Sequence, residues 1–238
     1  MSRHVRTYYD TFSTTYEKER HRGYHALVDD LESDLVRRHA AGPRVLEVGC
    51  GTGLVLERIA QFADGAVGAD LSGGMLAHAR RRGLDVVQAD ACSLPFRDAA
   101  FDAVASFKVL AHVPDIERAL SEIARVTRPG GRMVLEFYNR NSLRYLAKRL
   151  TGPRKVAEGA REDAISTRFD DLASIERVLP PGVRTVSVSG VRVVTPAAFL
   201  HRIPLLAWVL GRMEWAARDS WFGRFGGFLV VVVEKDPV

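Results

Sequence analysis

The chain has 238 residues, of which 47% are hydrophobic and 26% charged; this composition is typical of one globular domain with a small cap and excludes extended disorder. A net charge of +5 and a pI near 9.5 are only mildly basic, which disfavours a nucleic-acid partner but is compatible with a surface near anionic lipid. Two cysteines, no apolar secretory signal and no apolar run near the roughly 20 residues of a membrane span predict a soluble, cytoplasmic protein without a structural metal.

The first 40 residues predict a helical leader. An aromatic, weakly helical segment at 8–16 precedes a helix at 24–39 that packs on the sheet. In this helix Leu27, Leu31 and Leu35 form one apolar stripe, with Asp29, Asp30, Arg37 and Arg38 mostly off it. His21 and His25 could chelate a metal ion, but no third ligand follows nearby, which disfavours a metal site.

The stretch V-L-E-V-G-C-G-T-G at 45–53 predicts a buried parallel strand, a tight turn and a helix over 54–62. A backbone carrying Gly49, Gly51 and Gly53 can lie directly against a bound molecule because glycine lacks a Cβ. A dinucleotide turn reads G-x-G-x-x-G, whereas here the third glycine comes one residue early. Glu47, inside the strand, suits a cationic ligand better than a pyrophosphate. The turn therefore favours a cationic cofactor.

After this turn the strands and helices alternate, which is typical of a doubly wound parallel sheet of the α/β class. We expect strands at 66–71, 85–89, 101–106 and 132–138, and helices at 73–82 and 116–126. The carboxyl ends of neighbouring parallel strands lie side by side, so Asp70 should meet a ligand held by the glycine turn. An acid about 20 residues after such a turn binds ribose hydroxyls. Asp90 follows the third strand and should meet an adenine.

Beyond residue 140 the sequence predicts helices at 141–150 and 169–179 around a polar link at 151–166, a strand at 183–194, a helical region at 199–218 interrupted at Pro204, and a β-prone run at 228–234. Apolar side chains alternate with arginines in the C-terminal part: Phe199, Leu205, Leu206, Trp208, Trp215, Trp221 and Phe222 with Arg202, Arg212, Arg218 and Arg224. Two interpretations stay open: ordinary core with solvated arginines, or a greasy substrate pocket with a cationic rim that also suits a membrane surface.

Five segments between Val45 and Asn139 carry a resemblance to a known family: V-L-E-V-G-C-G-T-G, G-A-D-L-S-G-G-M-L, Q-A-D-A-C-S-L-P-F, F-D-A-V-A-S-F-K-V-L-A-H-V and R-P-G-G-R-M-V-L-E-F. In this order and spacing they resemble the motifs of class I S-adenosylmethionine-dependent methyltransferases, especially the ubiquinone/menaquinone methyltransferase-like group (methyltransferase type 11). The resemblance implies a seven-stranded, mostly parallel, Rossmann-like sheet whose last strand is antiparallel. It divides one domain, 1–238, into a helical leader (1–40), a cofactor-binding core (41–139) and a remainder with substrate cap inserts (140–238).

The resemblance also implies which residues hold the cofactor, S-adenosyl-L-methionine. The glycine-turn residues would surround its methionine and ribose portion, Asp70 would bind the ribose diol, and the others would lie along the adenine or near the methionyl end. The full set is Glu47, Gly49, Cys50, Gly51, Gly53, Asp70, Leu71, Met75, Asp90, Ala91 and Phe107. Met75 is equally compatible with a core position in its helix.

Methyl transfer needs a base only if the nucleophile arrives protonated. The candidates are His112, Glu136, His25 and Tyr24; for His112 and Glu136 the resemblance is equally compatible with a structural role. Lys108 departs from the family pattern, in which a small or neutral residue is more usual. We expect it to face solvent; in the site it would orient an acidic substrate group.

These observations predict a cytoplasmic methyltransferase for a lipophilic or aromatic small molecule, such as a quinone, phenol or prenyl compound. One alternative is a methyltransferase for tRNA or protein, whose affinity would fall steeply with salt. Another is a cofactor-binding regulatory module that performs no transfer. Oligomeric state and the acceptor atom are not determined by the sequence.

Overall fold

The computed structural model describes residues 3–16, 23–40, 42–142, 145–146, 149, 155–157, 160–161, 167–195 and 197–237. Its helices are α1 (Arg3–Tyr16), α2 (Tyr24–His39), α3 (Leu54–Ile59), α4 (Gly73–Arg81), α5 (Ile116–Val126), α7 (Leu172–Val178) and α8 (Pro204–Ala217), with short 3-10 turns η1 (Leu110–His112), η3 (Ala198–Arg202) and η4 (Trp221–Phe225). Its strands are β1 (Arg44–Val48), β2 (Gly65–Asp70), β3 (Asp85–Gln88), β4 (Phe101–Ser106), β5 (Thr127–Tyr138), β6 (Lys155–Ala157), β7 (Ala160–Arg161), β8 (Val183–Val191) and β9 (Phe228–Lys235).

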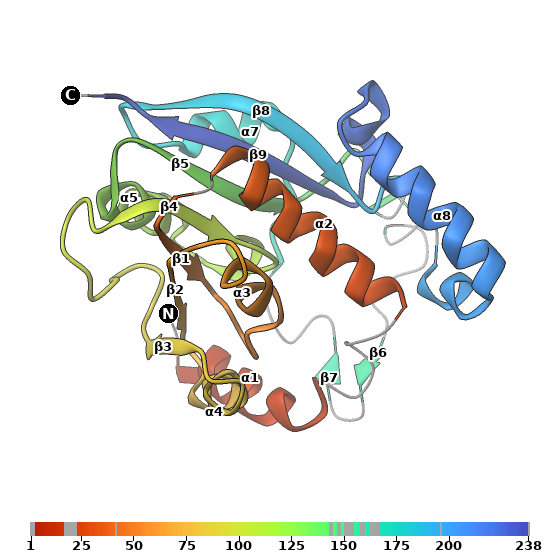
Figure 1. Cartoon of the computed structure of the whole chain (residues 1–238), viewed down its shortest axis with the longest axis horizontal. Coiled ribbons are helices and arrows are strands. Elements are labelled where there is room, and N and C mark those ends of the chain that lie inside the picture. The colour runs from red at the N-terminus through yellow and green to blue at the C-terminus, as the bar shows by residue number, and fades with distance from the viewer. Residues whose placement is uncertain are drawn as a thin grey trace.

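Seven strands form one sheet in the order β3-β2-β1-β4-β5-β9-β8 (Figure 1). The pairings from β3 to β5 are parallel, and β9 pairs antiparallel with both β5 and β8. From the centre of the sheet, β1, β2 and β3 follow one another toward one edge, and β4 and β5 follow toward the other. The strand order therefore reverses between β1 and β4. Ligands of doubly wound sheets bind at such a switch point, outside the carboxyl ends of the strands. The predicted seven-stranded sheet with an antiparallel last strand is confirmed.

Helices cover both faces of the sheet: α2 and α3 cross in front of it in Figure 1, and α5 and α7 lie behind it. Strand side chains alternate between these two layers because a strand has a period of two. Val45 of β1 packs in the cluster with Leu31 and Leu35 of α2, whereas Leu46 packs in the cluster with Leu120 of α5. The predicted leucine stripe of α2 is therefore confirmed as a core contact.

Most predicted elements lie within a few residues of the observed ones. The strand predicted at 132–138 is longer in the structure, because β5 begins at Thr127. Pro204 interrupts the C-terminal helical region as expected and occupies the first turn of α8, where its missing N–H costs no hydrogen bond. Half of the predicted helix at 141–150 and most of the link at 151–166 lie outside the described residues. No helix in the described ranges is long and apolar enough to cross a membrane.

Candidate active site

A cavity of about 960 Å³, including its part open to solvent, lies at the carboxyl ends of β1, β2 and β4. Its wall combines the glycine turn, the end of β2, the start of α4, the segment after β4 and two tyrosines of α1. Among the lining residues are Glu47, Gly49, Cys50, Gly51, Asp70, Leu71, Met75, Ala91, Phe107 and His112, all of them predicted site residues. The structure therefore brings most of the predicted set together around one space.

The glycine turn follows β1 with left-handed backbone angles that favour glycine: φ is 78° at Gly49, 54° at Gly51 and 85° at Gly53. A Cβ on Gly51 would meet nothing within 4 Å, because this peptide borders the open cavity. A Cβ on Gly53 would lie 2.5 Å from Leu84 and 3.1 Å from Ala79. Gly53 therefore lets α3 begin close to α4 and β3, and it is not among the residues that line the cavity.

Asp70 ends β2 beside this turn. Its Oδ2 accepts the backbone N–H of Gly51 at 2.9 Å, and its Oδ1 accepts that of Ser72 at 2.8 Å. The pKa of Asp70 is raised by burial, a rise that these two hydrogen bonds oppose. Each carboxylate oxygen has two lone pairs, so both can still accept a hydrogen bond from a ligand. Asp70 therefore fixes the shape of the turn and presents acceptors to the cavity.

Four carboxyl side chains form a buried layer between the sheet and α2. Strand alternation points Glu47 of β1 and Glu136 of β5 toward α2, on the same face as Val45 and Val134. Asp29 and Glu32 of α2 point back toward them, and each of the four residues is at most 2% exposed. Asp29 was expected off the packed stripe of α2 but is fully buried, as is Glu32. These two residues, which line the cavity, were missed by the sequence analysis.

Lys108 supplies the cation of this acid layer. Its Nζ lies 3.2 Å from Asp29 Oδ1 and 2.7 and 2.8 Å from the two carboxylate oxygens of Glu32. Its backbone N–H donates to Glu136 Oε1 at 3.1 Å, with a left-handed φ of 60°. The side chain is only 20% exposed and lines the cavity. The expectation that Lys108 faces solvent is therefore wrong, because two buried carboxylates hold it inside.

The single positive charge of Lys108 cannot neutralise all four carboxyls of the acid layer, and the pKa values of Glu47 and Glu136 are raised. Burial, and then the charge of Glu32, raises the pKa of Glu47 to about 8. The pKa of Glu136 is well above its usual value for the same reasons, and its carboxyl shares a hydrogen bond with Glu32. Glu47 Oε2 is buried and accepts no hydrogen bond from any described residue. It is an acceptor, at the cavity wall, that a cationic ligand would satisfy.

Helix α1 closes the cavity from outside through Tyr9 and Tyr16. Asp10 fastens this helix to the start of α4: its Oδ1 accepts from the Ser72 hydroxyl at 2.5 Å and from the Gly74 backbone N–H at 3.0 Å. Burial raises the pKa of the Tyr9 phenol, which stays protonated. The sequence predicts an aromatic leader here, but Tyr9 and Tyr16 were not among the predicted site residues.

The far end of the cavity is formed by Ala89, Ala91 and Leu94. Asp90 is not part of this wall; its Oδ1 accepts the Cys92 backbone N–H at 2.9 Å and so shapes the turn that presents Ala91. The predicted contact of Asp90 with an adenine stays a prediction.

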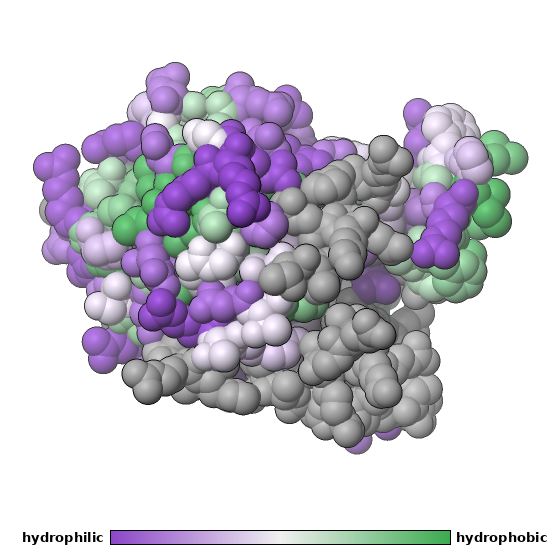
Figure 2. Space-filling view, turned by 90° about the horizontal axis from the view of Figure 1, so that it is seen from below, coloured by the Kyte–Doolittle hydropathy of each residue, from purple (hydrophilic) through white to green (hydrophobic). Residues whose placement is uncertain are grey.

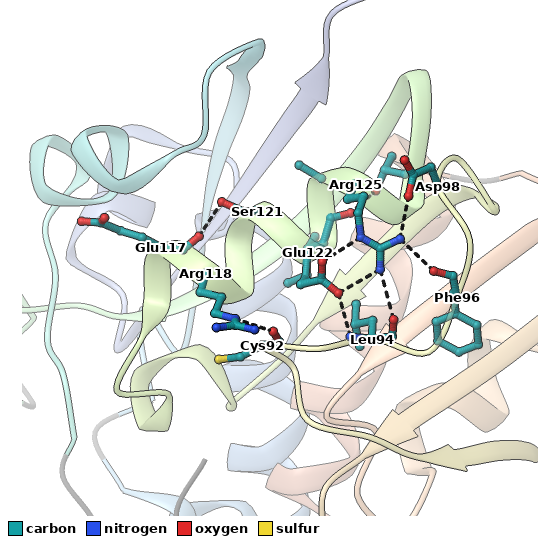
Figure 3. Close-up of polar contacts among 12 residues, drawn as sticks. Cys92, Leu94, Phe96, Asp98, Glu117, Arg118, Ser121, Glu122 and Arg125 are labelled. Atoms are coloured by element: carbon teal, nitrogen blue, oxygen red, sulfur yellow. Dashed lines mark hydrogen bonds and ion pairs between the residues drawn. The ribbon is translucent and has the colours of Figure 1, made fainter.

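The loop after β3 is held in place from α5 (Figure 3). Arg125 donates to the carbonyl oxygens of Leu94 and Phe96 and to the carboxylates of Glu122 and Asp98, at 2.7 to 3.1 Å. The Leu94 backbone N–H in turn donates to Glu122 Oε2 at 2.8 Å. A planar guanidinium with five donors can make all these bonds at once. Arg125 thereby fixes one wall of the cavity without touching it.

The four candidate bases lie in different places. His112, in η1, lines the cavity, and its ring meets that of Tyr138 edge-on at 5.5 Å. Glu136 lies beneath Lys108 in the acid layer and is not part of the cavity wall. Tyr24 is buried against His201 at a ring distance of 5.1 Å, and His25 lies beside it. Glu136, Tyr24 and His25 are thus not among the residues that line the cavity. His21 lies outside the described residues.

The fold is shared with solved structures along almost the whole chain. A Thermotoga maritima protein described as a SAM-dependent methyltransferase superposes with a TM-score of 0.72 at 21% identity, covering 96% of this chain and 98% of that one. The [4+2]-cyclase SpnF superposes with a TM-score of 0.66 at 21% identity, covering 98% and 96%. At such identities the likeness shows the fold alone.

The sequence comparison matches part of the chain to a known family. A model of the methyltransferase domain matches residues 46–135, which include the glycine turn, Asp70 and His112. These residues form a methyltransferase domain. Demethylmenaquinone methyltransferases of Thermus thermophilus and Mycobacterium sp. (strain KMS) are 47% identical over 106 residues and 45% over 94, covering 41% and 40% of this chain. The chain spans 48% and 41% of the length of these two curated relatives.

The methyltransferase domain implies S-adenosylmethionine as cofactor, and the cavity fits that molecule. The unsatisfied Glu47 Oε2 suits an ammonium group, the open face of Gly51 leaves room for a ligand against the backbone, and Asp70 offers acceptors to hydroxyl groups. Leu71, Met75 and Leu94 provide the apolar surface that a purine ring requires.

Proposed function

We propose that the chain is an S-adenosylmethionine-dependent methyltransferase that acts on a lipophilic or aromatic small molecule of the phenol or quinol class. The observation that carries the proposal is the composition of the cavity wall in the methyltransferase domain. A buried, unsatisfied carboxyl at Glu47 and the surrounding acid layer favour a cation at one end, and apolar side chains favour a purine at the other. A dinucleotide, with its negative pyrophosphate, would meet this acid layer unfavourably.

The quinol class is supported by the named activity of the relatives, the demethylmenaquinone methyltransferases. Their match covers less than half of this chain. The acceptor is therefore proposed on chemical grounds as well: Phe107 and Val109, which follow β4 in the cavity wall, give an apolar surface near the acid layer, suited to an aromatic ring.

When bound, the cofactor supplies a methyl group on a positively charged sulfur. The chain's own task is to hold two reactants in line and to exclude water, which contributes up to ~7–11 kcal/mol when the reactants are held as near-attack conformers. Tyr9 and Tyr16, fastened over the cavity by Asp10, would exclude water. A ring nitrogen of His112 would take the proton of a phenol or quinol hydroxyl, because His112 is the one candidate base in the described cavity wall.

The test is the release of S-adenosylhomocysteine by the full chain across a panel of quinols, phenols and amines. With the best acceptor, His112→Asn should lower kcat about 10²–10⁴-fold, the range of general acid–base catalysis. His25→Asn is the matched control, since His25 lies outside the cavity wall, and should change kcat less than about twofold. Equal effects of the two substitutions would refute the role of His112.

Two other outcomes would replace the proposed function. Tight cofactor binding without turnover on any acceptor would indicate a binding module or, as the [4+2]-cyclase of the same fold illustrates, a different reaction. Turnover on tRNA or protein, with an affinity for RNA that falls steeply as salt rises, would indicate a macromolecular substrate.

A further inference from the structure

The C-terminal segment from η3 through α8 to η4 exposes an unusual amount of apolar surface. Ten large apolar side chains between residues 199 and 225 are exposed: Phe199, Ile203, Leu205, Trp208, Val209, Met213, Trp215, Trp221, Phe222 and Phe225. Leu205 is 74% exposed, and Phe199 and Phe222 are each 63% exposed. Large apolar patches of this kind mark interaction surfaces. We call these ten residues the apolar patch.

The patch faces outward because the inner side of α8 is held by polar contacts. The buried carboxylate of Glu214 accepts the backbone N–H groups of Val193, Val194 and Thr195 at 2.6 to 3.0 Å. One turn later, the buried Arg218 donates to Asp34 Oδ2 of α2 at 2.9 Å. These bonds fix the rotation of α8 about its axis. The helix is thus inverted relative to an ordinary surface helix, with charged groups inside and tryptophans outside.

The charges around the patch have one sign. Arg212 lies 5.3 Å over the ring of Trp208, and Arg224 lies 5.0 Å over the ring of Trp221. Neither guanidinium is ion-paired in the part of the chain that the structure describes. Of the two acids between 199 and 225, Glu214 is buried, and Asp219 is paired with Arg38 and Arg218. Figure 2 shows the corresponding lobe, at the right, with hydrophobic side chains at its outer edge beside hydrophilic ones.

We propose that the apolar patch docks on the surface of an anionic lipid bilayer. Tryptophan and phenylalanine fit the boundary between headgroups and acyl chains, and the arginines between them fit anionic headgroups. A symmetric dimer through the same patch would add Arg212 and Arg224 of a second copy without an acid between 199 and 225 that is both exposed and free of an ion pair in the described structure. Docking extends the proposed function by giving a membrane-dissolved acceptor a route to the enzyme, but it does not depend on methyl transfer.

The tryptophans make a selective probe, because all three in the chain, Trp208, Trp215 and Trp221, belong to the patch. The full chain is titrated with vesicles of phosphatidylcholine alone or with 30% phosphatidylglycerol, without cofactor or acceptor. Anionic vesicles should shift the tryptophan emission to the blue, acyl-brominated lipid should quench it, and the protein should sediment with the vesicles. Binding should weaken as salt rises.

Two variants and a control separate the contributions. R212Q/R224Q should weaken binding to anionic vesicles roughly 25-fold, at about fivefold per arginine. L205S/F222S should weaken it at least about tenfold through lost apolar burial. All four side chains are exposed, so both variants should keep the circular dichroism and melting temperature of the wild type. R80Q/R81Q removes the same charge from the exposed end of α4 and should leave vesicle binding unchanged.

Three results would overturn the proposal. The first is the absence of any emission shift with anionic vesicles. The second is an equal loss of binding in R80Q/R81Q, which would show that net charge alone is responsible. The third is an emission shift that depends on protein concentration without lipid, together with a dimeric mass, which would assign the patch to self-association.

Discussion

The raised pKa of Glu47 predicts that cofactor binding depends on pH. A carboxyl with a pKa of about 8 is mostly protonated at pH 7, and only its ionised form can pair with a cation. If binding requires that form, the affinity should rise about ninefold from pH 6 to 7 and about fivefold from pH 7 to 8, and about 0.9 proton should leave on binding at pH 7. Isothermal titration calorimetry in two buffers of different ionisation enthalpy measures both quantities.

Glu47→Gln keeps the size of the side chain and removes its ionisation. The variant should bind the cofactor about 10- to 100-fold more weakly at pH 8, the scale of a hydrogen bond to a charged group, and should lose most of the pH dependence. Glu57→Gln makes the same chemical change on the exposed side of α3, where Glu57 pairs with Arg82, and should leave affinity and slope unchanged. A flat wild-type affinity between pH 6 and 8, or an undiminished slope in Glu47→Gln, would refute this role of Glu47.

The same pKa has a consequence for the protein without ligand. Because the folded pKa of Glu47 is raised above 4.5, the folded state holds more protons than the unfolded state between pH 4.5 and about 8. The stability that this proton uptake contributes is complete below pH 4.5 and is lost as pH rises through 8. Urea unfolding should therefore show a free energy of unfolding that declines over this window, and Glu47→Gln should flatten the decline.

Three further substitutions test other parts of the site. Lys108→Met leaves the acid layer without its cation and should lower the free energy of unfolding by about 3–5 kcal/mol, as for a broken buried ion pair. The loss should be larger at pH 8 than at pH 5, because removal of the cation raises the pKa values of the neighbouring carboxyls further. A loss in urea unfolding that does not depend on pH would contradict this. Asp70→Ala should weaken cofactor binding by ~1.5–3 kcal/mol. An analogue without ribose hydroxyls should bind the variant and the wild type about equally. Unchanged cofactor affinity in the variant would rule out the ribose contact. Arg125→Lys keeps the charge but not the forked donor geometry and should lower the free energy of unfolding by about 2 kcal/mol, whereas Arg80→Lys on α4 should be neutral in the same assay.

The fold could be predicted from the sequence because its signals are local. The strand–turn–helix at 45–62 and the alternation that follows it depend on residues within a few positions of one another. Asp70 was correctly expected at the cavity because parallel strands bring their carboxyl ends to one edge of the sheet. The direction of the Asp90 side chain was not predicted: its bond from the Cys92 N–H is an Asx turn, one of several conformations open to an acid in a loop.

The acid layer could not be predicted in the same way, because it is assembled from α2, β1, β5 and the segment after β4. A signal was present: Asp29, Glu32 and Val36 recur at helical spacing and form a second stripe beside the leucines. That stripe is buried, but the leucine stripe by itself was sufficient to predict a helix that packs on the sheet. Which stripe faces the cavity depends on the rotation of α2 about its axis, and in the structure Arg218 helps to fix that rotation by bonding to Asp34 and to the Leu31 carbonyl.

The acid layer and the apolar patch depend on the same helix. Arg218 connects α8 to α2, and α2 carries the two carboxylates that hold Lys108 beneath the cavity. A buried ion pair tolerates little displacement because its attraction offsets the desolvation of both charges only in good geometry. Arg218 thus links the C-terminal helix directly to the helix that carries two of the four carboxyls of the acid layer.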